Sequence, residues 1–258
     1  MVRHLRAFIQ KFLGAFVFYT QIPLPHTLPL DFDGIARFAP IVGLLIGGVL
    51  LFVGVMLFSV ASPLLVAAIV VALWVWITGA LHLDGAMDTA DGLGCMDKAR
   101  RLDVMRDPHS GAYGMIVAIV ILLLKTAALA QDGIVAQGTA IMALPLVCGW
   151  ARWGQLIAIA RFPYLRAEGK GKLHKRSIRG FGDGLPSLLI LLGCQLIPYF
   201  SGDFSLEQTL MMPIVALFFS WGFATWINGK LGGHTGDTYG AIVEWTETVL
   251  LCTLALMS

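Results

Sequence analysis

The chain has 258 residues, of which 57% are hydrophobic and only 13% are charged, and its mean hydropathy is +0.79. A composition this apolar excludes an ordinary soluble domain and predicts that most of the chain lies in a lipid bilayer. The net charge of +2 is too small to favour nucleic acid as a partner. The four cysteines are scattered without a CxxC pair, which argues against a zinc site or a disulfide framework.

The first 22 residues place apolar side chains at helical spacing beside basic ones. This pattern is typical of a helix that lies in the membrane interface. Pro23 and Pro25 are expected to end that helix. The segment lacks the small-residue cleavage site of a secretory signal, so we expect it to remain in the mature protein.

Apolar runs long enough to cross a bilayer follow one another along the rest of the chain. A spanning helix needs about 20 mainly apolar residues. We therefore predict an all-α, polytopic transmembrane bundle of about seven spans with an N-terminal interfacial helix, in a single domain covering residues 1–258. The predicted spans are 36–60, 63–81, 111–130, 135–160, 184–200, 209–229 and 237–257.

The basic residues divide the connections between spans into two sets. One set contains no Lys or Arg, whereas the other contains every basic residue except Lys125 and Arg152, which lie inside predicted spans. By the positive-inside rule the basic set is cytoplasmic. The aspartate-rich segments fall on the same side, so we expect substrate to bind at the cytoplasmic face.

The first segment whose residues could form a catalytic or metal site is GALHLDGAMDTADGLG, residues 79–94, at the end of the second predicted span. If the helix continues through it, Asp84, Asp88 and Asp91 share one face. Three crowded carboxylates repel unless a cation neutralises them, and an all-oxygen cluster suits Mg²⁺. The alternative is a solvated acidic helix end, but carboxylates at membrane depth are functional candidates.

The second segment is LDVMRDPHSGAYG, residues 102–114. Arg106 is suited to clamping a phosphate, and Asp107 to binding a metal or accepting a proton. Against this, Asp-Pro-His-Ser-Gly is also ordinary turn and helix-capping sequence.

The third segment is GGHTGDTYGAIVEW, residues 232–245. Asp237 and Glu244 are seven residues apart and share a helical face. An unpaired Glu244 two turns into a span is costly, so it needs a metal, a proton or a basic partner such as Arg152 or Lys125. A structural ion pair inside the bundle is the alternative.

A basic segment, residues 161–179, carries seven Lys or Arg side chains. It either fixes topology and contacts anionic lipid, or forms a lid that attracts a negatively charged nucleotide. Neither a GxxxxGK[ST] phosphate loop nor a GxSxG nucleophile is present. These patterns favour phosphate chemistry organised by a metal and arginine.

Three segments in this order carry a family resemblance: HLDGAMDTADG (82–92), MRDPHSGAYG (105–114) and HTGDTYGAIVE (234–244). Together with FYTQIPLP (18–25) and FAPIVGLLIGG (38–48), they make the whole chain resemble the adenosylcobinamide-GDP ribazoletransferase family, also called cobalamin-5′-phosphate synthase. The resemblance implies a bacterial inner-membrane enzyme that uses Mg²⁺. It implies attack by α-ribazole, or its 5′-phosphate, on adenosylcobinamide-GDP, with release of GMP and formation of adenosylcobalamin or its 5′-phosphate.

Roles for individual residues follow as hypotheses. Mg²⁺ would be held by Asp84, Asp88 and Asp91, completed by Asp237 or Glu244, and would stabilise the departing GMP. Arg106 would hold a non-bridging oxygen, and Asp91 or Asp107 would orient or deprotonate the attacking 5′-hydroxyl. The expected substrate-binding residues are His82, His109, Arg152, Thr235, Lys172 and Lys175.

Two other functions use similar features. A CDP-alcohol phosphotransferase of phospholipid synthesis also sets aspartates beside Mg²⁺ at a membrane helix end, although its motif order differs. A transporter would use the acids as coupling sites, but they gather at one interface and no inverted repeat is apparent. Further expected partners are membrane lipid, other enzymes of nucleotide-loop assembly and a second copy of the chain. Gly43, Gly47 and Gly48 suit either helix packing within the bundle or a dimer.

Overall fold

A computed structural model describes residues 2–131, 139–166, 170–178 and 180–257. Residues 135–138 of the predicted fourth span, and 167–169 and 179 of the basic segment, lie outside the described residues. Within the described ranges the chain is helical, and its extended backbone pairs only at an isolated bridge between Tyr164 and His234. The helices are α1 (Val2–Tyr19), α2 (Ala39–Phe58), α3 (Pro63–Thr78), α4 (Leu81–Gly94), α5 (Arg101–Val104), α6 (Ala112–Leu129), α8 (Thr139–Arg161), α9 (Lys170–Ser177), α10 (Leu185–Ser201), α11 (Leu206–Leu231) and α12 (Gly236–Leu256), with 3₁₀ turns η1 (Ile35–Phe38), η2 (Lys98–Arg100) and η3 (Phe181–Gly184).

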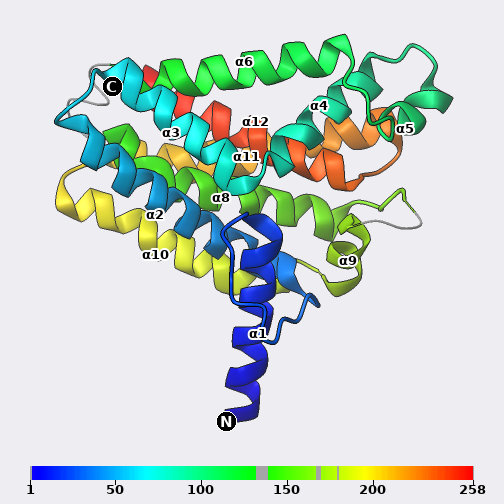
Figure 1. Cartoon of the computed structure of the whole chain (residues 1–258), viewed down its shortest axis with the longest axis horizontal. Helices are drawn as coiled ribbons and strands as arrows, with labels where there is room; N and C mark the ends of the chain where they lie inside the picture. Colours follow the sequence, from blue (N-terminus) through cyan, green and yellow to red (C-terminus); the bar gives the residue numbers. More distant parts are fainter. Residues whose placement is uncertain (1, 132–138, 167–169, 179, 258) are drawn as a thin grey trace.

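The predicted number of spans is confirmed. Six helical segments in the described part of the chain are long and apolar enough to cross a membrane, and α3 with α4 makes a seventh if this bent pair counts as one span. The six segments are Ile35–Phe58, Ala112–Leu129, Met142–Arg161, Phe181–Ser201, Leu206–Leu231 and Gly236–Leu256. Helix α1 is not among them and runs across the direction of the long helices (Figure 1), as expected for an interfacial helix.

A sharp bend separates α3 from α4. The two helices meet at 88° because Gly79 and Ala80 both adopt left-handed backbone conformations, with φ of 59° and 55°. A Cβ on Gly79 would lie 2.2 Å from Nε2 of Gln21, so this position needs glycine on two counts. The second span therefore does not run straight into residues 79–94, but α4 alone still carries Asp84, Asp88 and Asp91 on one helix, as their spacing on a shared face requires. It stops at Thr78 and resumes in a new direction as α4.

Helices α8 and α12 form the centre of the bundle. The structure buries 83% of the α8 span and 72% of the α12 span, against 33% or less of the other four unbroken spans. Glycines let α2 pack closely on α8, since a Cβ on Gly43 or Gly47 would approach the backbone oxygens of Cys148 or Leu144 within 2.4 Å. These two glycines therefore serve packing within the bundle, whereas Gly48 has no atom within 4 Å of such a Cβ.

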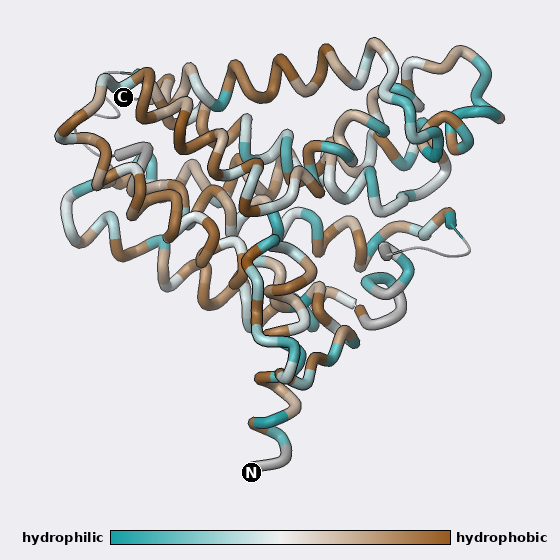
Figure 2. Tube along the Cα trace, in the orientation of Figure 1, coloured by the Kyte–Doolittle hydropathy of each residue, from teal (hydrophilic) through white to brown (hydrophobic). Residues whose placement is uncertain are grey.

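Hydropathy varies along the length of the bundle. Figure 2 shows mainly hydrophobic residues along α2, α3, α6 and α10, whereas hydrophilic residues gather around α5, at the end of the bundle where α4 ends. The aspartate-rich and basic segments thus lie toward one end of the long helices, which is where a water-soluble substrate would arrive.

Candidate active site

Two glycines allow α4 to lie directly against the start of α12. A Cβ on Gly85 would come within 2.6 Å of the backbone oxygen of Asp237, and a Cβ on Gly240 within 2.9 Å of the backbone oxygen of His82. Neither position accepts a larger side chain unless the helices separate. The first and third sequence motifs are therefore in contact, as a shared site requires.

A cavity of about 240 Å³ opens at this junction. Its walls come from α1, α4, α8, α9, α12 and the segment between α8 and α9. Asp84 is exposed, and the side chains of Asp237 and Arg166 are each 18% exposed, so these three residues mark the mouth of the cavity. The predicted substrate-binding residue His82 lies at the buried end.

Arg166 is a site residue that the sequence motifs did not single out. Its Nη2 lies 2.6 Å from Oδ2 of Asp237 and also donates to the backbone oxygen of Met105, 3.1 Å away. The backbone around Arg166 is fixed by the bridge between Tyr164 and His234, in which the amide of Leu165 donates to the His234 oxygen. Charge was the only signal for Arg166 in the sequence, and the basic segment holds six other Lys or Arg side chains.

Thr235 and Asp237 lie at the N-terminus of α12. Thr235 is the N-cap residue, and it forms a reciprocal capping box with Thr238. Its hydroxyl also donates to Oδ2 of Asp237 at 3.2 Å. The predicted substrate-binding residue Thr235 therefore contributes to the site by holding the α12 terminus and the Asp237 carboxylate.

Asp91 joins the first motif to the second. Its two oxygens accept the backbone N–H groups of Gly111 and Gly114, each at 2.8 Å, which caps the start of α6. A Cβ at either glycine would come within 2.4 Å of the carboxylate. Both Asp91 oxygens are therefore occupied by helix capping in this structure, although each retains a lone pair that a cation can share.

The other predicted residues of the second motif lie outside the first cavity. Asp107 and His109 line a separate open hollow of about 440 Å³ together with Asp91. The carboxylate of Asp107 accepts a hydrogen bond from the backbone N–H of His109 and a second from the ring of His109. Both contacts lower the pKa of this carboxyl, the backbone contact more strongly. Arg106 is more than half exposed and faces Asp103 at 3.8 Å. The structure thus brings Asp84 and Asp237 together, but it does not bring Arg106 or Asp107 to their cavity.

The aspartates of α4 and α12 have the composition of a Mg²⁺ site. Asp88 lies within electrostatic reach of Asp84, Asp91 and Asp237. Carboxylate oxygens are the ligands that Mg²⁺ prefers. Over the described ranges, no three His, Cys, Asp or Glu side chains converge closely enough to hold a metal ion. The donor set therefore fits Mg²⁺ in its chemistry, although the described side chains do not form a closed set of ligands in this structure.

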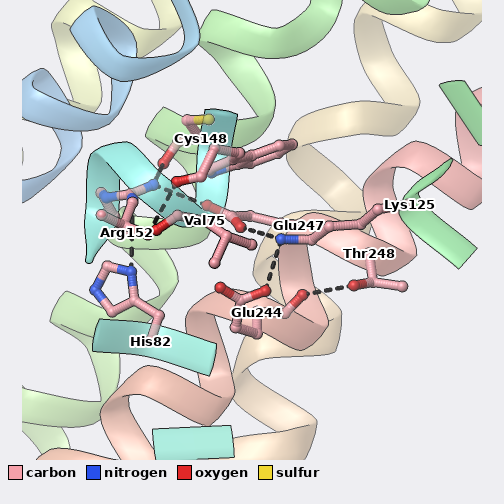
Figure 3. A network of polar contacts seen from close by, with 10 residues as sticks. Val75, His82, Lys125, Cys148, Arg152, Glu244, Glu247 and Thr248 are labelled. Carbon is pink, nitrogen blue, oxygen red and sulfur yellow. Dashed lines mark hydrogen bonds and ion pairs between the residues drawn. The ribbon is translucent and has the colours of Figure 1, made fainter. Parts of the chain in front are cut away.

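Glu244 belongs to a buried network of charges (Figure 3). The Lys125 ammonium lies 2.6 Å from a carboxylate oxygen of both Glu244 and Glu247, and it also lies over the ring of Trp74. Arg152 donates to Glu247 at 2.8 Å. All four charged side chains are at most 8% exposed. The basic partner that the sequence predicted for Glu244 is therefore Lys125. The sequence analysis did not predict that Glu247 joins this network.

Arg152 reaches the cavity only through a neighbour. It is completely buried, and it donates to the backbone oxygen of Cys148 as well as to Glu247. Its Nη2 lies 3.5 Å from Nδ1 of His82, which lines the cavity. The predicted substrate-binding residue Arg152 is thus placed to orient His82.

The two predicted lysines of the basic segment lie near the cavity wall. Lys175 donates to the backbone oxygens of Ile159 and Ala160, where its charge suits the C-terminus of α8. The backbone of Lys172 hydrogen-bonds Tyr164, whose pKa is raised by burial. His174 lines the cavity itself and stacks on Tyr19, and burial lowers its pKa to about 4.

The fold and the site together define a polytopic membrane protein that presents an acidic, arginine-containing cavity toward one end of its helical bundle. Residues 11–255 match the family described as Cobalamin-5-phosphate synthase. The chain therefore belongs to the cobalamin-5-phosphate synthase family, and the resemblance read from its motifs is confirmed.

Curated relatives agree with this assignment. The adenosylcobinamide-GDP ribazoletransferase of Trichormus variabilis is 48% identical over 95% of this chain and 96% of its own length. The protein of the same name from Synechococcus sp. is 46% identical over 92% of this chain and 92% of its own length. The one from Synechocystis sp. is 43% identical over 95% of this chain and 94% of its own length. No solved structure matches the chain. The phospholipid-synthesis and transport alternatives are not favoured by these relatives.

Proposed function

We propose that this chain transfers the adenosylcobinamide phosphoryl group from adenosylcobinamide-GDP to α-ribazole or α-ribazole 5′-phosphate and releases GMP. The observation that carries the proposal is the name shared by its relatives, which align with more than nine-tenths of the chain. The acidic cavity supports the same reaction, since it supplies carboxylates and a guanidinium at one mouth. If both acceptors react, the attacking oxygen is a ribose hydroxyl other than the 5′ one, because the 5′-phosphate form has that position blocked.

The residues at the mouth suit the reacting diphosphate. Asp84, Asp88 and Asp237 would hold Mg²⁺, with Asp91 as a further ligand predicted from the sequence. Glu244, the other predicted ligand, is instead paired with Lys125 inside the bundle and does not line the cavity. When bound, the ion would supply charge neutralisation for the diphosphate and the departing GMP. Arg166 is held beside Asp237 and would donate to a phosphate oxygen. Arg106, the arginine predicted for this task, would instead have to approach from outside the cavity.

A carboxylate is proposed to accept the proton of the attacking hydroxyl. The sequence motifs propose Asp91 or Asp107 for this role, and the cavity adds Asp84 as a third candidate because it alone of the three lines the first cavity. The Asn variant of the true proton acceptor should lose turnover with its substrate affinities kept. The variant of a metal ligand should instead raise the Mg²⁺ concentration needed for half-maximal rate.

The test is GMP release by the purified protein in lipid nanodiscs, from adenosylcobinamide-GDP with α-ribazole or its 5′-phosphate, with Mg²⁺ or with EDTA. Asp84→Asn should abolish release at the Mg²⁺ concentration that saturates the wild-type protein, while Glu207→Gln, which changes an exposed carboxylate in the first turn of α11, should leave it unchanged. GMP release in EDTA would refute the Mg²⁺ requirement alone. A folded protein that releases no GMP with either acceptor would refute the transferase proposal.

The cytoplasmic position of the site, in a bacterial inner membrane, is also a proposal and rests on the basic residues around it. A single cysteine placed at Met96, which is 95% exposed, should be shielded in intact cells from a maleimide reagent that cannot cross membranes. A single cysteine at Glu207, in the first turn of α11 at the opposite end of the bundle, should react. Reversed labelling would refute this orientation. Lipid, other enzymes of nucleotide-loop assembly and a second copy of the chain stay predicted partners.

A further inference from the structure

The buried end of the 240 Å³ cavity carries four polar atoms without a hydrogen-bond partner. They are the hydroxyls of Tyr19 and Tyr239, Nε2 of His82 and Oε1 of Gln155. All four side chains are at most 3% exposed and line the same cavity. A buried polar atom without a hydrogen-bond partner destabilises the protein unless a bound molecule supplies the partner. Four of them around one cavity indicate a place where something polar binds.

The neighbours of His82 determine what it offers to a ligand. A guanidinium can only donate, so the contact between Nη2 of Arg152 and Nδ1 of His82 makes Nδ1 the acceptor. The proton of the neutral ring then lies on Nε2, the atom without a partner. Arg152 itself is fixed by Glu247. The buried end therefore presents one N–H donor, one amide acceptor and two hydroxyls that can do either.

The walls of the cavity are aromatic. Tyr19 stacks on His174 with an interplanar angle of 6°, and Tyr164 stacks on Tyr239 with an angle of 26°. Phe18 completes this lining from the last turn of α1. Aromatic walls with a few placed polar groups are typical of sites for planar organic ligands.

Charge and size restrict the ligand further. The charged side chains of the lining, Asp84, Asp237 and Arg166, all lie at the mouth, and the four residues of the buried end carry no charge when the histidine is neutral. Burying a phosphate there would be costly. A volume of about 240 Å³ is below the usual range of 300–1,000 Å³ for drug-sized ligands. One aromatic nucleoside is of suitable size, whereas a corrinoid is far too large.

We propose that the buried end of this cavity binds the uncharged base of the acceptor nucleoside between the tyrosines, and that the ribose, with its attacking hydroxyl and any 5′-phosphate, is directed to the charged residues at the mouth. This inference rests on the proposed function, because both proposed acceptors, α-ribazole and its 5′-phosphate, carry the same uncharged aromatic base. The large and charged parts of adenosylcobinamide-GDP would then remain outside the cavity, on the open side of the mouth.

Binding can be tested without the reaction. Isothermal titration with α-ribazole alone, in nanodiscs without Mg²⁺ and donor, should show saturable binding to the wild-type protein. Tyr19→Phe and Tyr239→Phe each remove a single hydroxyl and should raise the Kd by about 2- to 10-fold, the range expected for one hydrogen bond. Tyr199→Phe, in the last turn of α10, is the matched control and should leave the Kd unchanged.

Steady-state kinetics separates the two substrates. The Tyr→Phe variants should raise KM for α-ribazole and leave KM for adenosylcobinamide-GDP unchanged. A raised KM for the donor only, or competition of guanosine with α-ribazole at equal affinity, would overturn the inference. So would α-ribazole affinity equal to wild type in both variants.

Two results keep this inference distinct from the proposed function. Binding of α-ribazole that the two hydroxyls strengthen, in a protein that never releases GMP, would support the site and refute the transferase. GMP release by variants whose KM for α-ribazole is unchanged would support the transferase and refute the nucleoside site. If a variant unfolds, the melting temperature of the wild-type protein is measured with each nucleoside instead. A rise with α-ribazole but not with guanosine would support the inference, and an equal rise with both would overturn it.

Discussion

Removing the charge of Lys125 tests whether the buried network holds the bundle together. The two lysine–glutamate contacts of 2.6 Å and the Arg152–Glu247 contact of 2.8 Å join α6, α8 and α12. Two positive and two negative charges sum to zero, so Lys125→Met leaves one uncompensated negative charge inside the bundle. Breaking a buried pair in this way costs about 3–5 kcal/mol. For a chain of this size the corresponding loss in melting temperature is about 6–20 °C.

The assay is the melting temperature of the protein in nanodiscs, followed by loss of helical circular dichroism. Lys230→Met removes an exposed lysine from the last turn of α11 and should shift the melting temperature by no more than about 2 °C. The double variant Lys125→Met with Glu244→Gln restores zero net charge and should recover at least half of the loss. A single variant as stable as the control, or a double variant no better than the single, would refute the reasoning.

Three further predictions concern local contacts. Gly85→Ala should cost about 1–3 kcal/mol of stability and lower activity, because its Cβ would push α4 away from α12, whereas Gly48→Ala, with open space around it, should melt like wild type. Asp91→Ala should cost about 1 kcal/mol by uncapping α6, whereas Asp91→Asn should cost less because it keeps one acceptor; equal melting temperatures for the two would contradict this. Burial lowers the pKa of His174 from 6.5 to about 4, so the unfolded chain binds an extra proton in that window and stability falls as pH falls from 6.5 to 4. His174→Phe should flatten this pH dependence of the melting temperature, and an unchanged slope would show that the ring does not contribute.

The spans could be predicted because their signal is local. A run such as 111–130 has the length of about 20 mainly apolar residues that a spanning helix needs, and its observed counterpart, Ala112–Leu129, differs by one residue at each end. The family could be predicted for a related reason, since three short motifs fix it. Neither signal depends on how the helices pack.

The arrangement of the site depends on packing and could not be predicted in the same way. The 88° bend comes from two consecutive left-handed residues, and Ala80 gives no sign of such a backbone in the sequence. The approach of Arg166 to Asp237 joins positions 71 residues apart along the chain. Glu247 offered a usable signal, because an acidic residue in a span needs a partner as much as Glu244 does.

Helix α1 has a consequence for how the site is maintained. Its first turns expose Leu5, Phe8 and Ile9, whereas its last residue, Tyr19, is fully buried in the cavity wall. If these first turns lie in the membrane interface, as the sequence predicts, the same helix would contact lipid at one end and line the proposed nucleoside cavity at the other. A change in bilayer thickness or headgroup charge, or a detergent that displaces α1, is then expected to alter acceptor affinity without altering any carboxylate. The membrane surface would in that case contribute to the shape of the binding site.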